Sequence, residues 1–392
     1  MRKSTALIAT LAALMVLSFA NIQTSHGLAS GSIKVALLGS ESMASYVTDV
    51  QTYLAAFSDL TIIDIIDVRS STPSLATLLN YDTVLVWSDS SFFNPIALGD
   101  VLADYVDLGG GVVMATFSWY GPSYDLEGRM MTDYSPFLPA TSNLYTTANL
   151  GTYDSSHPIM QGVTAISEYY RDDVTLATDA VQIAAWDDGV PFVATKGRVV
   201  GMTLFPPPVE WTGDVPTLVH NALLWSVPDP VLELMPATGF ASTTIVGSGG
   251  FAANSKITIT WDGTPVPTVP MEITTDAYGN FTAVVSVLTP NVPGAHLVNA
   301  TDESGRSWAT TFTVIDMTGP QGEEGLPGAT GTTGGTGAQG AKGDTGAQGP
   351  AGVVPVESIA LAFIPAIIAI ILAVYALMKM HLPRAQPAPA PA

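Results

Sequence analysis

The sequence of 392 residues contains no cysteine, so neither a disulfide framework nor a thiolate metal site can stabilise it. Basic residues are also scarce, because 13 lysines and arginines stand against 34 aspartates and glutamates and leave a net charge of −21. Phosphate backbones are bound through lysine and arginine, so this deficit excludes nucleic acid as an expected partner. Stability must come from packed cores, and the length allows at least two of them.

Long hydrophobic runs are confined to the two ends of the chain. The first follows two basic residues and ends in small side chains, which is typical of a secretory signal peptide, expected within 1–29, with an uncleaved anchor as the alternative. The second, within 355–379, is long enough to cross a bilayer at ~1.5 Å per residue. Basic residues follow it, so the positive-inside rule predicts a cytoplasmic tail, 380–392. We therefore expect a single-pass protein of the cell membrane with its N-terminal part outside the cell.

A strict glycine repeat precedes the second hydrophobic run. Twelve glycines fall at every third position from Gly319 to Gly352. Only glycine fits at the axis of three wound polyproline-like chains, so this register predicts a collagen-like stalk over 318–354. A homotrimer through this stalk is one expectation, and an extended single-chain linker is the alternative.

The stretch 30–228 alternates apolar runs of strand length with helical patterns. This alternation indicates an α/β domain with a parallel sheet. The prolines at 228 and 230 mark its end. The predicted strands cover 33–38, 61–68, 83–87, 112–117, 183–185, 192–194 and 199–204, and the predicted helices cover 42–57, 74–80, 95–108 and 215–226.

The stretch 229–317 has short alternating runs, many threonines and valines, and frequent turn signals such as DAYGN and DESG. This pattern predicts a β-sandwich. The segments GSGGFAANSKITITWDG and PGAHLVNATDESG resemble the immunoglobulin-like modules of prokaryotic, especially archaeal, surface proteins. That resemblance implies a fold and no ligand. Asn280 and Asn299 begin N-x-T triplets and are candidate glycosylation sites.

The segments GGGVVMATFSWYG, SSHPIMQGV, RVVGMTLFPP and HNALLWSV in the α/β stretch resemble the class I glutamine amidotransferase-like fold. The resemblance implies a flavodoxin-like doubly wound sheet, with a nucleophilic cysteine at a strand-to-helix elbow and a catalytic histidine after a late strand. In this chain the elbow falls on Thr116 or Ser118, and the histidine position falls on Phe205. The catalytic positions are therefore replaced, and the resemblance implies an inactive domain without a cofactor.

A hydrolase remains the competing hypothesis. In it Ser118 would be the nucleophile and His157 the base. His157 precedes a proline in a loop, where a packed turn residue is the simpler explanation.

Aromatic and acidic residues gather near the carboxyl ends of the predicted strands, where open α/β sheets bind ligands. Asp89, Trp119, Tyr120 and Tyr124 are the candidate binding residues, and a cleft between them would suit a sugar ring or a peptide. Packing in the core or at its rim explains such aromatics equally well. The other aspartates of the stretch lack the spacing of a calcium loop, so no metal site is expected.

Taken together, these patterns predict a membrane-anchored cell-surface protein with a structural or adhesive role. It would present a non-catalytic, ligand-binding α/β domain on a stalk to an extracellular glycan or protein. The alternative is a surface-tethered hydrolase with a serine nucleophile. The ligand and the oligomeric state do not follow from the sequence.

Overall fold

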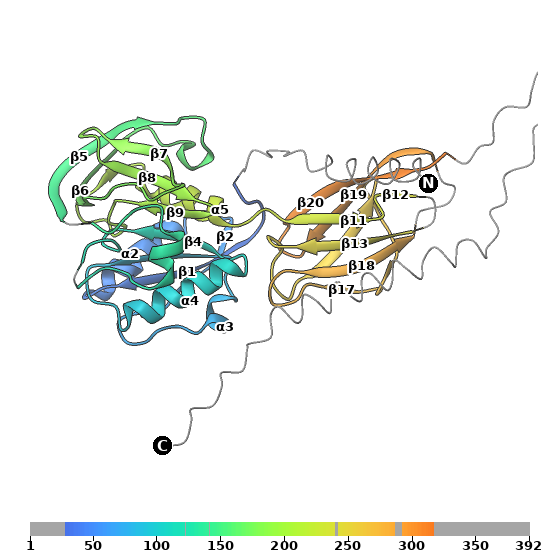
Figure 1. The fold of residues 1–392 in the computed structure, drawn as a ribbon, viewed down its shortest axis with the longest axis horizontal. Helices are drawn as coiled ribbons and strands as arrows, with labels where there is room; N and C mark the ends of the chain where they lie inside the picture. Colours follow the sequence, from blue (N-terminus) through green and yellow to red (C-terminus); the bar gives the residue numbers. More distant parts are fainter. Residues whose placement is uncertain (1–27, 122, 141, 240–241, 287–291, 317–392) are drawn as a thin grey trace, which may run out of the picture. The chain divides into compact units, whose positions relative to one another are not determined.

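The computed structural model describes residues 28–121, 123–140, 142–239, 242–286 and 292–316. These residues contain an α/β domain followed by an all-β domain (Figure 1). The predicted collagen-like stalk, membrane span and tail lie outside the described residues, and so does nearly all of the predicted signal peptide.

The α/β domain is built on one sheet of ten strands in the order β10-β6-β5-β7-β8-β9-β4-β3-β1-β2. Four junctions between strands are parallel, and they join β2, β1, β3, β4 and β9. Strands β3 and β4 are buried at every residue, as expected where both faces of a sheet are covered. The parallel strands are β1 (Ile33–Ser40), β2 (Leu60–Ile65), β3 (Thr83–Ser88), β4 (Gly111–Ala115) and β9 (Val199–Met202).

The other half of the sheet is antiparallel throughout. Short turns join β7 to β8 and β8 to β9, so no helix crosses over between these strands. A two-residue loop can join antiparallel strands, whereas parallel strands need a long crossover. These strands are β5 (Asn143–Tyr153), β6 (Ile166–Asp172), β7 (Val181–Trp186), β8 (Pro191–Lys196) and β10 (Thr212–Gly213).

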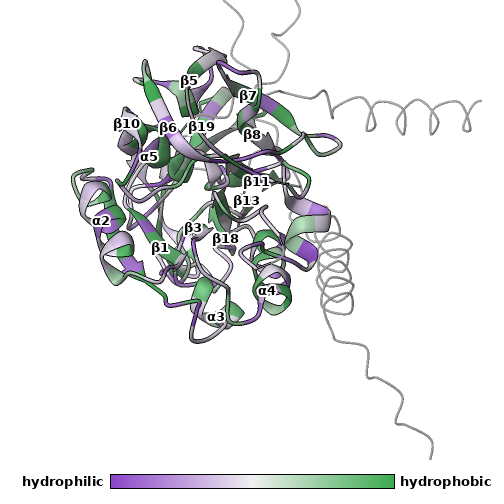
Figure 2. Ribbon diagram, turned by 90° about the vertical axis from the view of Figure 1, so that its left-hand side faces the viewer, coloured by the Kyte–Doolittle hydropathy of each residue, from purple (hydrophilic) through white to green (hydrophobic). Residues whose placement is uncertain are grey.

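Helices cover both faces of the parallel half (Figure 2). Helices α2 (Ala44–Leu54) and α5 (Val215–Ser226) pack on one face, and α3 (Leu75–Leu78) and α4 (Pro95–Asp107) pack on the other. Helix α4 begins where the side chain of Asn94 accepts a hydrogen bond from the Ala97 N–H, with a proline in the first turn. Two short turns, η1 (Met130–Tyr134) and η2 (Pro158–Met160), complete the domain.

The all-β domain consists of two sheets around a separate apolar core. One sheet has the order β11-β13-β18-β16, and the other has β12-β20-β19-β14-β15, with β17 paired to β14. Burial alternates along β18, so one side of that strand faces the core. The strands are β11 (Val231–Met235), β12 (Thr238–Gly239), β13 (Ser242–Ser248), β14 (Lys256–Trp261), β15 (Thr264–Pro265), β16 (Thr268–Val269), β17 (Ile273–Thr274), β18 (Phe281–Ser286), β19 (Gly294–Asp302) and β20 (Ser307–Val314).

The predicted fold class is corrected by this architecture. A flavodoxin-like doubly wound sheet would be parallel, whereas five of the nine junctions in the observed sheet are antiparallel. The prediction failed because the stretch that forms β5 and β6 carries exposed aromatic and polar residues and was not recognised as strand. The described residues are rich in sheet, and they do not form a simple doubly wound domain beside a membrane span.

The predicted membrane topology and cell-surface location are corrected as well. Among the described residues, no helix is both long enough and apolar enough to cross a bilayer. The longest, α4, has 13 residues and reaches about 20 Å, against the roughly 30 Å of a hydrocarbon core. The stretch that we expected to span, 355–379, is not part of the described chain.

Candidate functional site

A cavity of about 220 Å³ lies at the carboxyl ends of the parallel strands. Asp89 follows β3, Phe117 follows β4, and Phe205 follows β9, so three strand ends meet there. This is the edge of an open α/β sheet where ligands bind. The antiparallel half contributes side chains from β5 and β6. The complete lining is Tyr46, Asp89, Phe117, Tyr120, Tyr124, Tyr145, Tyr170, Phe205 and Val209.

The floor of the cavity is made of two buried phenylalanines. The ring centroids of Phe117 and Phe205 lie 5.6 Å apart. Phe117 also contacts three tyrosine rings of the lining, with centroid separations of 6.1–6.3 Å. Phe117 therefore connects the floor to the walls.

Tyrosines form the walls. Tyr120 and Tyr124 are stacked at 6.1 Å with an angle of 12° between their planes. Tyr170 meets Phe205 edge to face at 5.9 Å, and Tyr145 meets Tyr170 in the same way. Burial raises the pKa of Tyr145 and of Tyr170, so both phenols stay neutral at physiological pH.

Asp89 supplies the one carboxyl group of the lining. Its Oδ1 accepts a hydrogen bond of 3.1 Å from the backbone N–H of Ser42. Behind it lies Glu41, which is 5% exposed and accepts a hydrogen bond from the indole N–H of Trp87. Burial, reinforced by the neighbouring carboxyl of Asp89, raises the pKa of Glu41 to about 9. Glu41 is therefore protonated at neutral pH.

Two more acids are buried on β6, on either side of Tyr170. Glu168 is fully buried, and its Oε1 accepts hydrogen bonds from the N–H groups of Tyr169 and Tyr170 at 2.8 and 2.7 Å. Burial raises its pKa to about 8. Asp172 is equally buried, accepts a hydrogen bond of 3.2 Å from Asn143, and has its pKa raised by burial to about 7. Neither acid lines the cavity.

Three of the four predicted binding residues line this cavity, namely Asp89, Tyr120 and Tyr124. Trp119 does not. Its side chain is fully buried, and its indole N–H donates a hydrogen bond of 2.9 Å to Ser135.

Sequence reasoning missed the other lining aromatics for two reasons. Tyr145 and Tyr170 lie on β5 and β6, which were not predicted as strands. Phe117 and Phe205 were considered only as a strand end and as a replaced catalytic position. The tyrosines that cluster in the stretches of β5 and β6 are the sequence signal from which these wall residues could have been predicted.

The residues of the hydrolase hypothesis have separate surroundings. Ser118 is fully buried, and its hydroxyl donates toward the carbonyl of Val86 at 3.5 Å. His157 Nδ1 accepts a hydrogen bond from the Ile159 N–H, and its ring lies 5.4 Å from that of Trp225. Burial lowers the pKa of His157. Neither residue lines the aromatic cavity, and the described chain shows no hydrogen bond between them.

The glycosylation candidates lie in the all-β domain, and both side-chain amides make hydrogen bonds. Asn280 donates to Asp276 at 3.3 Å within a turn. Asn299 donates to Thr301 at 3.2 Å on β19 and is half-buried. Glycosylation at either site stays a prediction.

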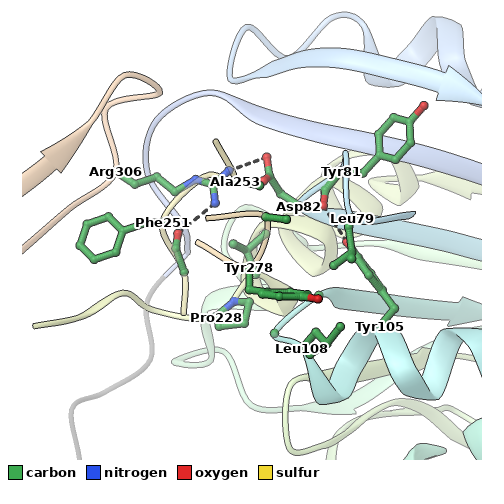
Figure 3. Close-up of a pocket in the computed structure, with 15 residues that line it drawn as sticks. Leu79, Tyr81, Asp82, Tyr105, Leu108, Pro228, Phe251, Ala253, Tyr278 and Arg306 are labelled. Carbon is green, nitrogen blue, oxygen red and sulfur yellow. Dashed lines mark hydrogen bonds and ion pairs between the residues drawn. The ribbon is translucent and has the colours of Figure 1, made fainter. Parts of the chain in front are cut away.

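A second hollow, near Arg306 and Asp82, is much smaller (Figure 3). Its volume of about 40 Å³ compares with the ~30 Å³ that one water occupies in the liquid. Arg306 forms an ion pair with Asp82 there and donates a hydrogen bond of 2.9 Å to the carbonyl of Gly250. This hollow is too small for an organic ligand. Elsewhere, the described ranges contain no group of three or more histidines and acidic residues arranged to hold a metal ion.

Comparison with known proteins gives no family for this chain. No family model matches it, and no curated protein matches it. A ThuA-like protein from Bacteroides uniformis is 12% identical over 50% of this chain and 93% of its own, with a TM-score of 0.38. A cytoplasmic protein from Salmonella typhimurium is 14% identical over 49% of this chain and 98% of its own, with a TM-score of 0.37. Likeness at this level assigns no activity.

These findings correct the wider interpretation of the sequence. We expected an archaeal-type surface protein with a degenerate amidotransferase-like domain, an immunoglobulin-like domain and a collagen-like repeat. No family model for any of these parts matches, and the similar solved structures include ThuA-like proteins. The described residues also contain no membrane-spanning helix. The expected structural or adhesive role stays a prediction.

Proposed function

We propose that the α/β domain is a non-catalytic binding domain and that the aromatic cavity holds a small ligand. The observation that carries this proposal is the lining itself, which combines seven aromatic rings with one carboxyl group. Concave sites with apolar walls and few polar groups are the usual form of small-molecule sites.

The size of the cavity restricts the ligand. Sites for drug-sized molecules span roughly 300–1,000 Å³. A cavity of about 220 Å³ suits a single ring or one compact group. The mouth is partly open, since the side chain of Tyr145 is 51% exposed, so a longer ligand would leave its remainder outside.

The chemistry of the lining favours binding over catalysis. A general base must reach the proton that it removes, and a nucleophile must reach the reacting atom. Among the described lining residues there is no serine, histidine or lysine, and the tyrosines with raised pKa values are poor bases, so Asp89 would have to act alone as base or nucleophile. Ser118, the nucleophile of the alternative hydrolase, is buried against Val86.

A panel of small ligands tests the proposal on the full chain. Monosaccharides, organic ammonium compounds and aromatic acids would be screened by ligand-observed NMR. We expect the signals of bound compounds to disappear in the double variant Tyr120→Ala/Tyr124→Ala. They should persist in Tyr153→Ala, a control at the end of β5 whose side chain does not line the cavity. Signals that survive the double variant, or a panel without any binder, would contradict the proposal.

A further inference from the structure

We propose that the ligand of the aromatic cavity is an organic cation that presents a methylated ammonium group. This inference rests on the proposed binding function and names the chemical class of the ligand. Two properties of the lining carry it: the arrangement of the rings and the sign of the charge.

The rings surround the cavity from several directions. Tyr120 and Tyr124 stack nearly parallel, while Tyr170 stands at 72° to the ring of Phe117 and at 75° to that of Phe205. An aromatic face carries negative charge density, and a cation within about 6 Å of ring centroids is attracted to it. Several rings around one space create the aromatic cage that suits a quaternary ammonium group.

The charge at the cavity has one sign. Asp89 is acidic, and no described lining residue is basic. Glu210 also lies close enough to contribute to the raised pKa of Tyr170. The nearby arginines have other partners, since Arg69 donates to the carbonyl of Glu41 at 2.7 Å and Arg171 pairs with Asp188 at 2.8 Å. A cation would therefore enter without meeting a competing positive group in the lining.

The single carboxyl group of the lining favours a methylated ammonium over a primary one. A primary ammonium has three N–H donors to satisfy, and Asp89 is the only carboxyl in the lining. A donor that is buried without a partner costs binding free energy, whereas a quaternary ammonium has no donor. A sugar is the main alternative, because the five tyrosine hydroxyls of the lining can donate and accept hydrogen bonds beside Asp89, and the experiments below distinguish it from a cation.

A matched pair of ligands distinguishes the effect of charge on affinity from the effect of shape. Binding of choline and of 3,3-dimethyl-1-butanol, its neutral carbon isostere, would be measured by calorimetry on the full chain. We expect choline to bind about 10-fold more tightly or better, because cation–π attraction across several rings is absent for the neutral compound. Equal affinity for the two compounds would overturn the inference.

Variants at Tyr120 distinguish the contribution of the aromatic ring to binding from that of its hydroxyl group. Tyr120→Phe keeps the aromatic face and should change choline affinity less than about twofold. Tyr120→Leu removes the face and should weaken binding by about 3- to 30-fold. Tyr145→Leu repeats the test at a side chain whose exposure makes misfolding a minor concern, and Asp89→Asn should weaken binding mainly at low salt.

The outcomes distinguish this inference from the proposed function. If a monosaccharide binds, choline does not, and Tyr120→Phe weakens that binding, the cation class is wrong while the binding domain stands. If neither choline nor tetramethylammonium binds at millimolar concentration, the inference also fails. The ligand panel with Tyr120→Ala/Tyr124→Ala then decides the proposed function by itself.

Discussion

The central strands of the parallel half and strand β5 of the antiparallel half differ in burial and in what they contribute to the cavity. Strands β1, β3 and β4 of the parallel half are buried almost throughout. Strand β5 of the antiparallel half is mostly exposed or half-buried. The parallel half supplies the buried floor through Phe117 and Phe205, whereas the antiparallel half supplies partly exposed wall residues.

This difference implies that the residues needed for stability and the residues needed for ligand binding lie mostly on different strands. Residues of β1, β3 and β4 lie in two apolar cores under the helices, so their truncation creates cavities. Wall residues on β5 can change with little loss of packing, because water already reaches them. We therefore expect β5 to respond to substitution differently from β1, β3 and β4.

The largest expected effect is on stability, in the parallel half. Leu37→Ala on β1 removes a fully buried side chain, and we expect a loss of about 2–5 kcal/mol in the free energy of unfolding. Tyr145→Ala on β5 should cost less than about 1 kcal/mol. Urea unfolding followed by circular dichroism measures both. Similar losses for the two variants would remove the contrast between the halves.

The next effect concerns a buried acid in the antiparallel half. Burial raises the pKa of Glu168 to about 8, above the value of an unfolded glutamate. The folded state therefore binds the proton more tightly, so this contribution to stability is complete below about pH 4.3 and is lost as the pH rises through 8. Glu168→Gln cannot ionise, and it should reduce the loss of stability between pH 5 and pH 9 by on the order of 1–3 kcal/mol.

Urea unfolding at both pH values provides the measurement. Glu233→Gln, at an exposed position of β11, is the matched control and should leave the pH dependence unchanged. Glu41 and Asp172 also have raised pKa values, so part of the pH dependence will remain in the variant. A Glu168→Gln profile that coincides with the profile of the unmodified chain would show that Glu168 does not carry a buried proton.

The parallel half was largely predictable from the sequence, and the antiparallel half was only partly so. Strand β3 reads as a continuous apolar run because both of its faces are covered, and it was predicted within one residue. Strands β5 and β6 have no such run. The buried acids Glu168 and Asp172 lie on β6 and interrupt the alternation in which inward-facing residues are apolar, so this stretch resembled a loop.

The candidate site was predictable to the same extent. Asp89, Tyr120 and Tyr124 lie in the loops after predicted strands, so the rule that ligands bind at strand ends pointed to them. Tyr46 and Tyr145 reach the cavity from α2 and β5, and only the three-dimensional packing brings them there. Trp119 is buried in the core and does not line the cavity, because adjacent residues near a strand end can point into the core or out of it.

A smaller effect is expected on ligand binding, and it distinguishes the floor of the cavity from its wall. Tyr145→Leu should weaken the binding of a cavity ligand by about 3- to 30-fold with little change in stability. Phe205→Leu should weaken binding and also destabilise the domain, because Phe205 is 3% exposed and contacts Phe117 and Tyr170. Calorimetric titration and thermal unfolding of the same samples measure the two properties. A stable Phe205→Leu variant with unchanged affinity would argue against its place in the floor.

The smallest expected effect is at the residues of the hydrolase hypothesis. Ser118→Ala removes a hydroxyl that only approaches the Val86 carbonyl at 3.5 Å, so stability should change by no more than about 1 kcal/mol. Ester and amide hydrolysis by the purified unmodified chain should be at background, and neither Ser118→Ala nor His157→Ala should change it, because the two side chains contact different parts of the domain. Turnover by the unmodified chain that disappears in both variants would require a rearrangement that exposes Ser118 and would restore the enzyme hypothesis. Ligand affinity provides an independent test of the two hypotheses. Ser118→Ala should leave the affinity unchanged if the aromatic cavity alone forms the site.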